Sequence, residues 1–215
     1  MPVITVSRQY GSLGDEIGKE VASRLGLRFV DYEVINEVAS RLGVPLSSVS
    51  EREEREGSIV SELVQTMRRL YPATLLPQPT EDKPELDEAS QLQMIREVIW
   101  EVARTNDALI VGRGGAFILP RHPTTLHVLV TAPAEIRVER VMAAEGLDHD
   151  RAEHRIKHVD EARGRYIRHF YRTNWLEVGH YDLVVNTGHF SHNEAVTLIC
   201  AAALPAEGLP RERDE

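Results

Sequence analysis

Short apolar runs rich in Val, Ile and Leu recur along this chain and alternate with stretches of helical periodicity. Five such runs predict β-strands, the second of them weakly: Val3–Ser7, Arg28–Asp31, Ala108–Gly112, Leu126–Thr131 and Asp182–Asn186. Apolar runs without polar alternation are typical of strands covered on both faces, as in a parallel sheet.

Helical periodicity fills most of the chain between these strands. The predicted helices are Gly14–Leu25, Glu33–Leu42, Ser58–Leu70, Glu88–Arg104, Ala134–Ala144, His149–Tyr171 and Ser191–Ala203. A regular alternation of strand and helix predicts right-handed crossovers. The expected fold is therefore α/β, a three-layer sandwich around a five-stranded parallel sheet.

Two stretches interrupt this alternation. Val44–Glu88 is far longer than one crossover needs, and it combines a charge run, an amphipathic helix and a proline-rich segment. We interpret it as a helical insert, about residues 44–88. Gly146–Trp175 is dense in Arg, His and Asp, and we interpret it as a mobile helical lid, about residues 146–175. The chain is thus predicted to be a single domain, 1–215, with a core of residues 1–43, 89–145 and 176–204.

Composition narrows the class of partner. The chain has 215 residues and a formal net charge of −9, which disfavours nucleic acid or an acidic membrane as the main partner. Its single cysteine, Cys200, rules out a disulfide within the chain and fits a reducing cytoplasm. We expect no signal peptide and no membrane span, since no apolar run approaches the ~20 residues required. The amphipathic helix Ser58–Leu70 leaves two alternatives open, burial on the core or on a second subunit of a homodimer.

The first predicted strand runs directly into Arg8-Gln9-Tyr10-Gly11-Ser12-Leu13-Gly14 and then into a helix. A glycine-punctuated turn of this kind lets backbone N–H groups converge on a phosphate at the positive end of the helix. The lysine of the generic phosphate loop is absent, and Arg8 is the candidate for the missing charge. The alternative is a tight strand-to-helix connection, with Asp15 and Glu16 favourably placed on the helix dipole.

A second candidate site follows the third strand, which ends in Gly112-Arg113-Gly114-Gly115. The carboxyl edge of the sheet is where ligands bind in open α/β folds. An arginine fork among glycines suits bidentate recognition of a phosphate or carboxylate. The alternative is an arginine in a surface salt bridge.

The predicted lid carries a third constellation of basic side chains: Arg151, Arg155, Lys157, Arg163, Arg165, Arg168 and Arg172. On a helix, Arg165, Arg168 and Arg172 share one face, which indicates either an anion clamp or a solvated charged face. His154 and His158 also share a face, but without a third ligand at convincing spacing we predict no metal site there.

Taken in this order, the motifs resemble those of the cytidylate kinase-like family, a branch of the nucleoside monophosphate kinases with a P-loop fold. The resemblance covers essentially the whole chain. Its motifs are Ser7-Arg8-Gln9-Tyr10-Gly11-Ser12-x-Gly14-x-Glu16-Ile17-Gly18, Phe29-Val30-Asp31-Tyr32, Val111-Gly112-Arg113-Gly114-Gly115, Thr131-Ala132-Pro133-Ala134-Glu135-x-Arg137-x-x-Arg140, Asp160-Glu161-Ala162-Arg163-Gly164-Arg165-Tyr166 and Tyr181-Asp182-Leu183-Val184-Val185-Asn186-Thr187.

The resemblance implies transfer of the γ-phosphoryl group of ATP to a nucleoside monophosphate such as CMP. It also implies Mg²⁺, for which the sequence assigns no protein ligands. In this interpretation Arg113 holds the acceptor phosphate, Asp31 helps to place the acceptor, and Arg163 and Arg165 stabilise the transferring group. The donor phosphates would lie on Arg8, Gln9, Tyr10, Gly11, Ser12, Leu13 and Gly14.

The sequence also departs from the family pattern. The loop lacks the Lys and Ser/Thr that cytidylate kinases carry, and Val111 and Gly114 stand where aspartates flank the Gly-Arg pair. These departures keep a second function open, a catalytically silent nucleotide- or anion-binding sensor or scaffold with a degenerate P-loop.

Overall fold

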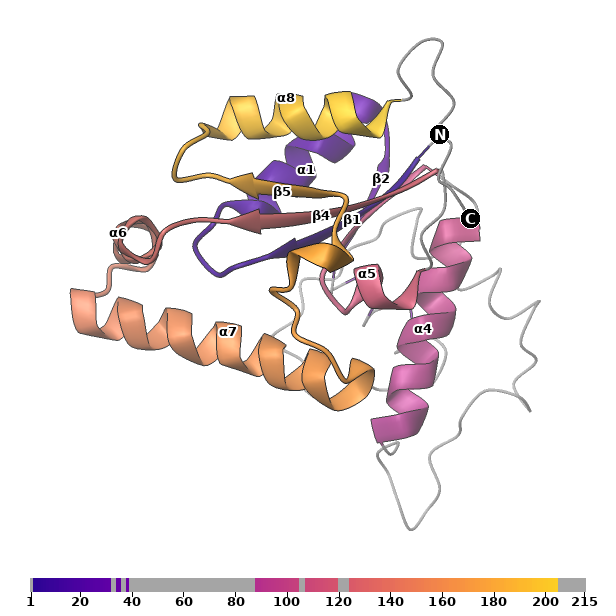
Figure 1. The fold of residues 1–215 in the computed structure, drawn as a ribbon, viewed down its shortest axis with the longest axis horizontal. Coiled ribbons are helices and arrows are strands. Elements are labelled where there is room, and N and C mark those ends of the chain that lie inside the picture. Colours follow the sequence, from indigo (N-terminus) through magenta and orange to yellow (C-terminus); the bar gives the residue numbers. More distant parts are fainter. Residues whose placement is uncertain are drawn as a thin grey trace.

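A computed structural model describes residues 2–31, 34–35, 38, 88–104, 107–119 and 124–204 of the chain. Its centre is a five-stranded sheet in the order β2-β3-β1-β4-β5 (Figure 1). Every neighbouring pair of strands is parallel, so the predicted sheet is confirmed. The strands are β1 (Val3–Arg8), β2 (Arg28–Val30), β3 (Ala108–Val111), β4 (Thr125–Thr131) and β5 (Leu183–Asn186).

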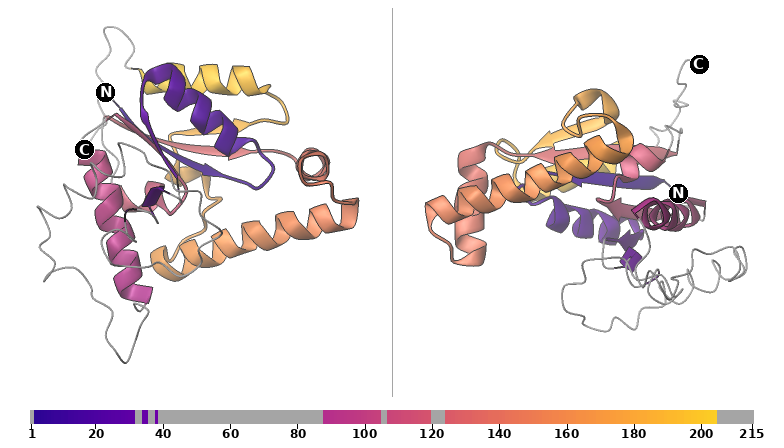
Figure 2. Two further views of the ribbon diagram at one scale, coloured as in Figure 1. Left: turned by 180° about the vertical axis from the view of Figure 1, so that it is seen from behind. Right: turned by 90° about the horizontal axis from the view of Figure 1, so that it is seen from below.

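Helices cover both faces of this sheet and complete the predicted three layers. α1 and α8 lie on one face and α4 and α5 on the other, while α6 and α7 lie beyond the carboxyl ends of the strands (Figures 1 and 2). The helices are α1 (Gly14–Leu25), α4 (Glu88–Arg104), α5 (Gly115–Ile118), α6 (Ala134–Glu145), α7 (His149–Tyr171) and α8 (His192–Ala203), with a 3₁₀ turn η1 (Val178–His180).

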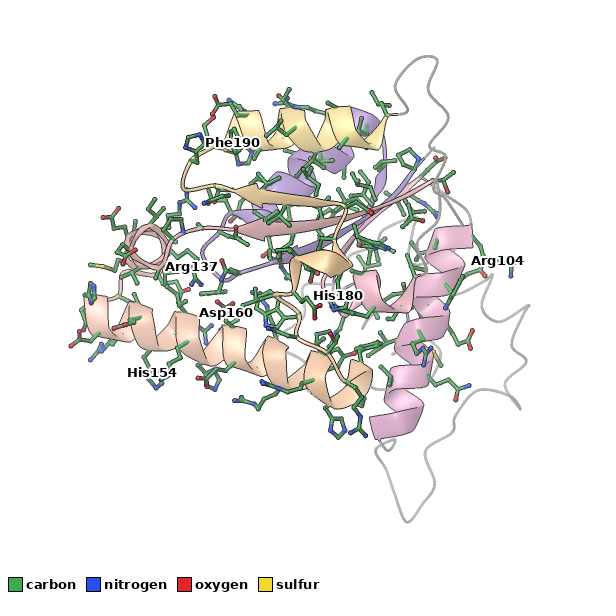
Figure 3. The ribbon with its side chains drawn as sticks, in the orientation of Figure 1. Arg104, Arg137, His154, Asp160, His180 and Phe190 are labelled. Atoms are coloured by element: carbon green, nitrogen blue, oxygen red, sulfur yellow. The ribbon has the colours of Figure 1, made fainter. Side chains whose placement is uncertain are left out.

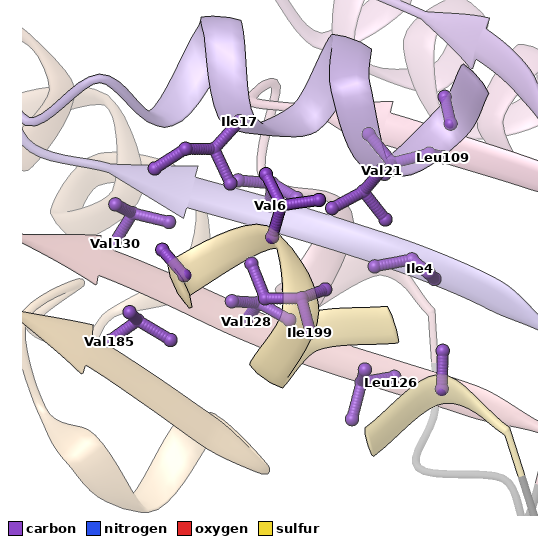
Figure 4. Close-up of a cluster of buried hydrophobic side chains, with 14 of the residues drawn as sticks. Ile4, Val6, Ile17, Val21, Leu109, Leu126, Val128, Val130, Val185 and Ile199 are labelled. Carbon is purple, nitrogen blue, oxygen red and sulfur yellow. The ribbon is translucent and has the colours of Figure 1, made fainter. Parts of the chain in front are cut away.

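The two faces of the sheet bury separate apolar clusters. Because successive strand residues point to opposite faces, Ile4 and Val6 of β1 pack with Ile17 of α1 and Ile199 of α8 (Figure 4). Val3 points the other way, into the cluster that contains the buried side of α4. The strands are therefore covered on both sides, as their continuous apolar runs predict.

Helix α7 is held near both of its ends. Ile156 packs against Val138 and Val141 of α6, whereas Ile167 packs with Trp175 and β4. The predicted lid segment thus forms one continuous helix, which crosses beneath the carboxyl edge of the sheet from α6 to α5 (Figure 1).

The sequence predicts the described elements closely. The bounds of α1, α4 and α7 match, and the other predicted helices with described bounds, like the strands, differ by one residue at an end. The short helix α5 was not predicted. Val34, Ile35 and Val38 are helical and buried, as expected, while the helix at Ser58–Leu70 and almost all of the predicted insert lie outside the described residues. The predicted domain boundaries therefore stay predictions. Within the described ranges, no helix combines the length and hydropathy needed to cross a bilayer.

We expect Ile199→Ala to reduce the free energy of unfolding by about 3 kcal/mol, since it removes a fully buried side chain from the interface of α8 and the sheet. The neighbouring Leu198 is 38% exposed, so Leu198→Ala is a matched control that should change stability by less than about 0.5 kcal/mol. Urea unfolding followed by circular dichroism measures both. Equal losses for the two variants would contradict the packing of α8 described here.

Candidate functional site

The turn between β1 and α1 has the backbone of an anion-binding loop. Gly11 and Leu13 both take left-handed conformations, with φ of 76° and 65°. Ser12 closes the turn, because its hydroxyl donates to the carbonyl of Gln9 at 2.7 Å. Helix α1 begins at Gly14 with no side-chain cap from Leu13, so the N–H groups of its first turn face the loop without an acceptor inside the helix.

One side of this loop is fixed by a carboxylate from α7. Asp160 Oδ1 accepts a hydrogen bond from the backbone N–H of Tyr10 at 2.9 Å. Its other oxygen pairs with Arg137 Nη1 at 2.7 Å, and the same Arg137 nitrogen donates to the Tyr10 carbonyl at 3.3 Å. Figure 3 shows Arg137 and Asp160 pointing toward each other from α6 and α7. The two side chains together satisfy both backbone groups of Tyr10.

The other side is fixed from the end of β5. The Thr187 hydroxyl donates to the Ser12 carbonyl at 2.9 Å. Arg140 donates to the Gly11 carbonyl at 3.4 Å and to the Thr187 carbonyl at 2.8 Å. The carbonyls of Gly11 and Ser12 are thus engaged by side chains from α6 and from the end of β5.

The Tyr10 side chain anchors the loop to the α6–α7 pair. Its ring packs against an apolar cluster of these two helices, and its hydroxyl donates to Glu145. The guanidinium carbons of Arg155 and Arg163 lie 5.7 and 5.9 Å from the ring centroid, within cation–π range. Loop and helix α7 therefore form one packed unit.

Arg8, the last residue of β1, pairs with Asp15 in the first turn of α1. The distances are 2.9 Å from Nη2 to Oδ1 and 3.1 Å from Nε to the same oxygen. The Arg8 side chain is 17% exposed and that of Asp15 is 48% exposed. The candidate cation of the loop therefore has its own counter-ion, on the solvent side of the pair.

Arg163 approaches the same point from α7. Its Nη1 donates to the Arg8 carbonyl at 2.9 Å and lies 3.5 Å from Asp160 Oδ1. Burial and, after it, the charge of Arg8 together lower the pKa of Arg163 to about 10, whereas Asp160 and Asp15 oppose the shift. Two guanidinium groups are thus crowded together at the loop, and Arg163 remains a cation at neutral pH.

Arg113 projects from a left-handed turn at the end of β3. Gly112, Arg113 and Gly114 have φ of 79°, 48° and 75°, and the turn is closed by a hydrogen bond from Gly115 N–H to the Gly112 carbonyl at 3.0 Å. Positive φ is unfavourable for an arginine. Glycines on both sides accommodate the turn, and a Cβ on Gly114 would make a tight contact of 3.1 Å with the Tyr171 ring.

These three arginines line one pocket of about 390 Å³ at the carboxyl ends of β1 and β3, under α7. Its remaining walls are mostly apolar. Burial raises the pKa of Tyr166, one of the wall residues, and the charge of Arg113 opposes that shift. The lining residues are Ser7, Arg8, Val111, Gly112, Arg113, Gly114, Phe117, Ala162, Arg163, Tyr166, Ile167 and Trp175. A partly apolar pocket with three guanidinium groups fits a phosphate ester that carries a ring system.

Not every predicted site residue lies in this pocket. Asp31 is at the same sheet edge, where it accepts the Val34 N–H at 3.0 Å. The Gln9 side chain accepts from the Ala132 N–H at 3.2 Å, which ties the loop to the end of β4. Arg165 is 62% exposed and pairs with Glu161 at 3.6 Å, away from Arg163.

The predicted stripe of Arg165, Arg168 and Arg172 is exposed along its length. Arg165 and Arg168 lie on the solvated face of α7, and Arg172 is the left-handed residue that follows the end of the helix. His154 also lies on the outer side of the helix (Figure 3). Among the residues that the structure describes, no group of three or more His, Cys, Asp or Glu side chains could hold a metal ion.

Sequence reasoning missed the side chains that hold the loop. Arg137, Arg140, Asp160 and Thr187 all contact its backbone. All four lie within the quoted family motifs, but their spacing gives no indication that they would meet residues so far away in the chain. The spacing of apolar residues on α7 does predict which face of this helix is buried. Ile156, Gly164 and Ile167 lie on that face, next to Asp160 and Arg163.

Comparison with known proteins agrees with this geometry. The model of the cytidylate kinase-like family matches residues 3–189. The chain belongs to this family. It is 27% identical over 188 residues to a cytidylate kinase from Ignicoccus hospitalis, covering 87% of this chain and 90% of that protein. It is 30% identical over 133 residues to a cytidylate kinase from Methanopyrus kandleri, covering 58% of this chain and 66% of that protein.

A solved structure supports the fold alone. A protein from Eubacterium ventriosum superposes with a TM-score of 0.67 at 18% identity, over 94% of this chain and 98% of that one. The family assignment and the fold together support a nucleotide kinase-type phosphotransferase that acts on small nucleotide substrates.

Proposed function

We propose that this chain transfers the γ-phosphoryl group of ATP to a nucleoside monophosphate, with CMP as the first candidate, in the cytoplasm. The observation that carries the proposal is the convergence of Arg8, Arg113 and Arg163 on one pocket beside the loop. Phosphoryl transfer depends almost wholly on positioning and on neutralising charge. Three guanidinium groups in a partly apolar pocket supply both.

The position of each arginine suggests its role. Arg8 adjoins the loop and is assigned to the donor phosphates, together with the amides of Gly11, Leu13 and Gly14. The N–H groups of Tyr10 and Ser12 already donate, to Asp160 and to the Gln9 carbonyl. Arg113 projects from β3 and is assigned to the acceptor phosphate. Arg163 contacts the Arg8 carbonyl and lines the same pocket as Arg113, so it is assigned to the transferring group.

The proposal keeps one residue that the sequence predicted, Asp31, and sets another aside, Arg165. Asp31 follows β2, at the sheet edge on which Arg113 also lies, and we retain it as a contact of the acceptor. Arg165 points away from the pocket, so we assign the stabilisation of the transferring group to Arg163.

The residues present fit ATP better than they fit Mg²⁺. Guanidinium groups and free first-turn amides are donors for phosphate oxygens. Mg²⁺ requires oxygen ligands, but both Asp15 and Asp160 are engaged by arginines. We assign no described side chain to Mg²⁺, which the family implies as a companion of the nucleotide phosphates.

A second candidate function is a catalytically silent nucleotide- or anion-binding sensor. Two observations favour it: Asp15 neutralises Arg8, and Asp160 occupies the Tyr10 N–H. Both contacts place a carboxylate where a phosphate oxygen would otherwise bind.

Steady-state consumption of ATP with a panel of nucleoside monophosphates separates the two functions. The kinase predicts turnover with at least one acceptor, and with CMP first. The sensor predicts no turnover but a higher unfolding temperature in the presence of nucleotide. Absence of both effects would contradict both functions.

A further inference from the structure

The first residue of α1 has no room for a side chain. A Cβ built on Gly14 would lie 2.4 Å from Arg8 Cβ and 2.9 Å from Arg8 Cγ. Real Cβ contacts do not approach so closely, and the blocking atoms are the stem of Arg8 rather than its mobile end. The Arg8 side chain therefore fills the space that a side chain at position 14 would need.

The far end of the same side chain lies against a second glycine, Gly112, whose φ of 79° itself favours glycine. A Cβ on Gly112 would lie 2.5 Å from Arg8 Nη1. The Arg8 side chain thus runs from the end of β1 across the start of α1 to the turn after β3. Glycines at positions 14 and 112 leave that path open.

This path matters because of what a phosphate loop normally carries at the start of its helix. In the generic motif a lysine follows the last loop glycine and reaches the β- and γ-phosphates of the nucleotide. In this chain Leu13 takes the left-handed conformation typical of that glycine, and Gly14 follows it as the first helical residue. Gly14 therefore stands at the lysine position, and the side chain that occupies the space there is Arg8.

We propose that Arg8 replaces the phosphate-loop lysine, entering the lysine's space from the end of β1, and that Gly14 is a glycine because of this exchange. The inference rests on the proposed function for the identity of the phosphates. Asp15 is the counter-ion that holds Arg8 until the phosphates take its place. Arg8 is thus a phosphate-binding residue, and Asp15 competes with the ligand.

A cycle of substitutions tests the exchange, with binding of tripolyphosphate and of ATP measured by calorimetry. Arg8→Gly should weaken binding of both about tenfold, the loss expected for one charge-assisted contact. The double variant R8G/G14K removes the blocking stem and places a lysine at position 14. We expect it to bind within about threefold of the wild-type protein.

Two matched controls isolate the cation. R8G/G14A relieves the same steric conflict without adding a charge, and it should bind no better than R8G. R8G/E16Q restores the net charge through an exposed residue of the same helix turn, and it should also bind no better. G14A alone should lower the unfolding temperature, because it forces the contact at 2.4 Å.

Asp15→Asn separates a phosphate-binding role from a structural one. If Arg8 serves only to pair with Asp15, D15N should weaken tripolyphosphate binding as much as R8G does, and that result would overturn the inference. We expect D15N to bind at least as tightly as the wild-type protein, because the competing carboxylate is gone. Equal affinities for R8G/G14K and R8G/G14A would also overturn it.

The proposed function can fail separately. Suppose that the wild-type protein binds tripolyphosphate and that R8G/G14K restores the binding lost in R8G, but that CMP supports no turnover. The replacement of the lysine by Arg8 is then supported, and the proposed kinase activity is contradicted. If CMP is phosphorylated while the cycle shows no rescue, the kinase stands and the exchange does not. Binding of neither ATP nor tripolyphosphate by the wild-type protein would overturn both.

Discussion

Arg163→Ala is expected to lower kcat with ATP and CMP about a thousandfold, with a much smaller change in either KM. The Arg163 side chain is 24% exposed, and its guanidinium is held by the Arg8 carbonyl and Asp160 before any substrate binds. A cation that is already oriented in a pocket shielded from water stabilises developing charge without reorganisation. Steady-state kinetics with each substrate varied in turn measures the effect.

The same helix offers a matched control for this prediction. Arg165 is two residues away, about 200° around the helix, and is 62% exposed beside Glu161. Arg165→Ala removes an equal charge from the solvent side, so we expect kcat to change less than about twofold, as for most surface substitutions. Comparable losses for the two variants would show that α7 turns a different face to the reacting phosphates during turnover.

The strands could be predicted closely because the information is local. The apolar runs predict strand ends at Ser7 and Gly112, and β1 and β3 end at Arg8 and Val111, each within one residue of the prediction. Helix α5 has only four residues and follows a left-handed turn, so it has no periodicity to detect. Short elements of this kind are formed by their surroundings rather than by their own sequence.

In the candidate site too, residues with a local sequence signal could be predicted, and residues whose position depends on packing could not. Arg113 could be predicted, because a guanidinium between glycines at the end of a buried strand is a local signal. Helical spacing separates Arg163 from Arg165, but the positions of the charged residues alone do not say which of the two faces the sheet. That choice depends on Ile156 and Ile167, which pack the helix against α6 and β4.

The loop contacts could not be predicted from the sequence. Asp160 meets the Tyr10 N–H across 150 positions of sequence, and Thr187 meets the Ser12 carbonyl across 175. Such pairs are fixed only by how the elements pack. The path of the Arg8 side chain over Gly14 could not be predicted either. The sequence shows that the lysine is absent, but it does not show which side chain fills the lysine's space.

Arg113→Ala and Arg113→Gly should both raise the KM for CMP about a hundredfold while leaving the KM for ATP nearly unchanged. Removing one partner of a shielded charged contact costs about 3 kcal/mol, which corresponds to this change in affinity. The two variants lose the same guanidinium but differ in backbone. At φ 48°, glycine avoids the strain that alanine keeps, so R113G should be more stable than R113A by about 1 kcal/mol.

Kinetics of R113A and R113G therefore tests the contact with the acceptor phosphate, and urea unfolding of the same two variants tests the left-handed turn. A rise in the KM for ATP in place of that for CMP would move Arg113 to the donor side of the pocket. Equal stability of R113A and R113G would contradict the left-handed turn that aims the side chain. We expect the turn and the phosphate contact to be coupled, because the left-handed conformation is strained for an arginine and is the conformation from which Arg113 lines the pocket.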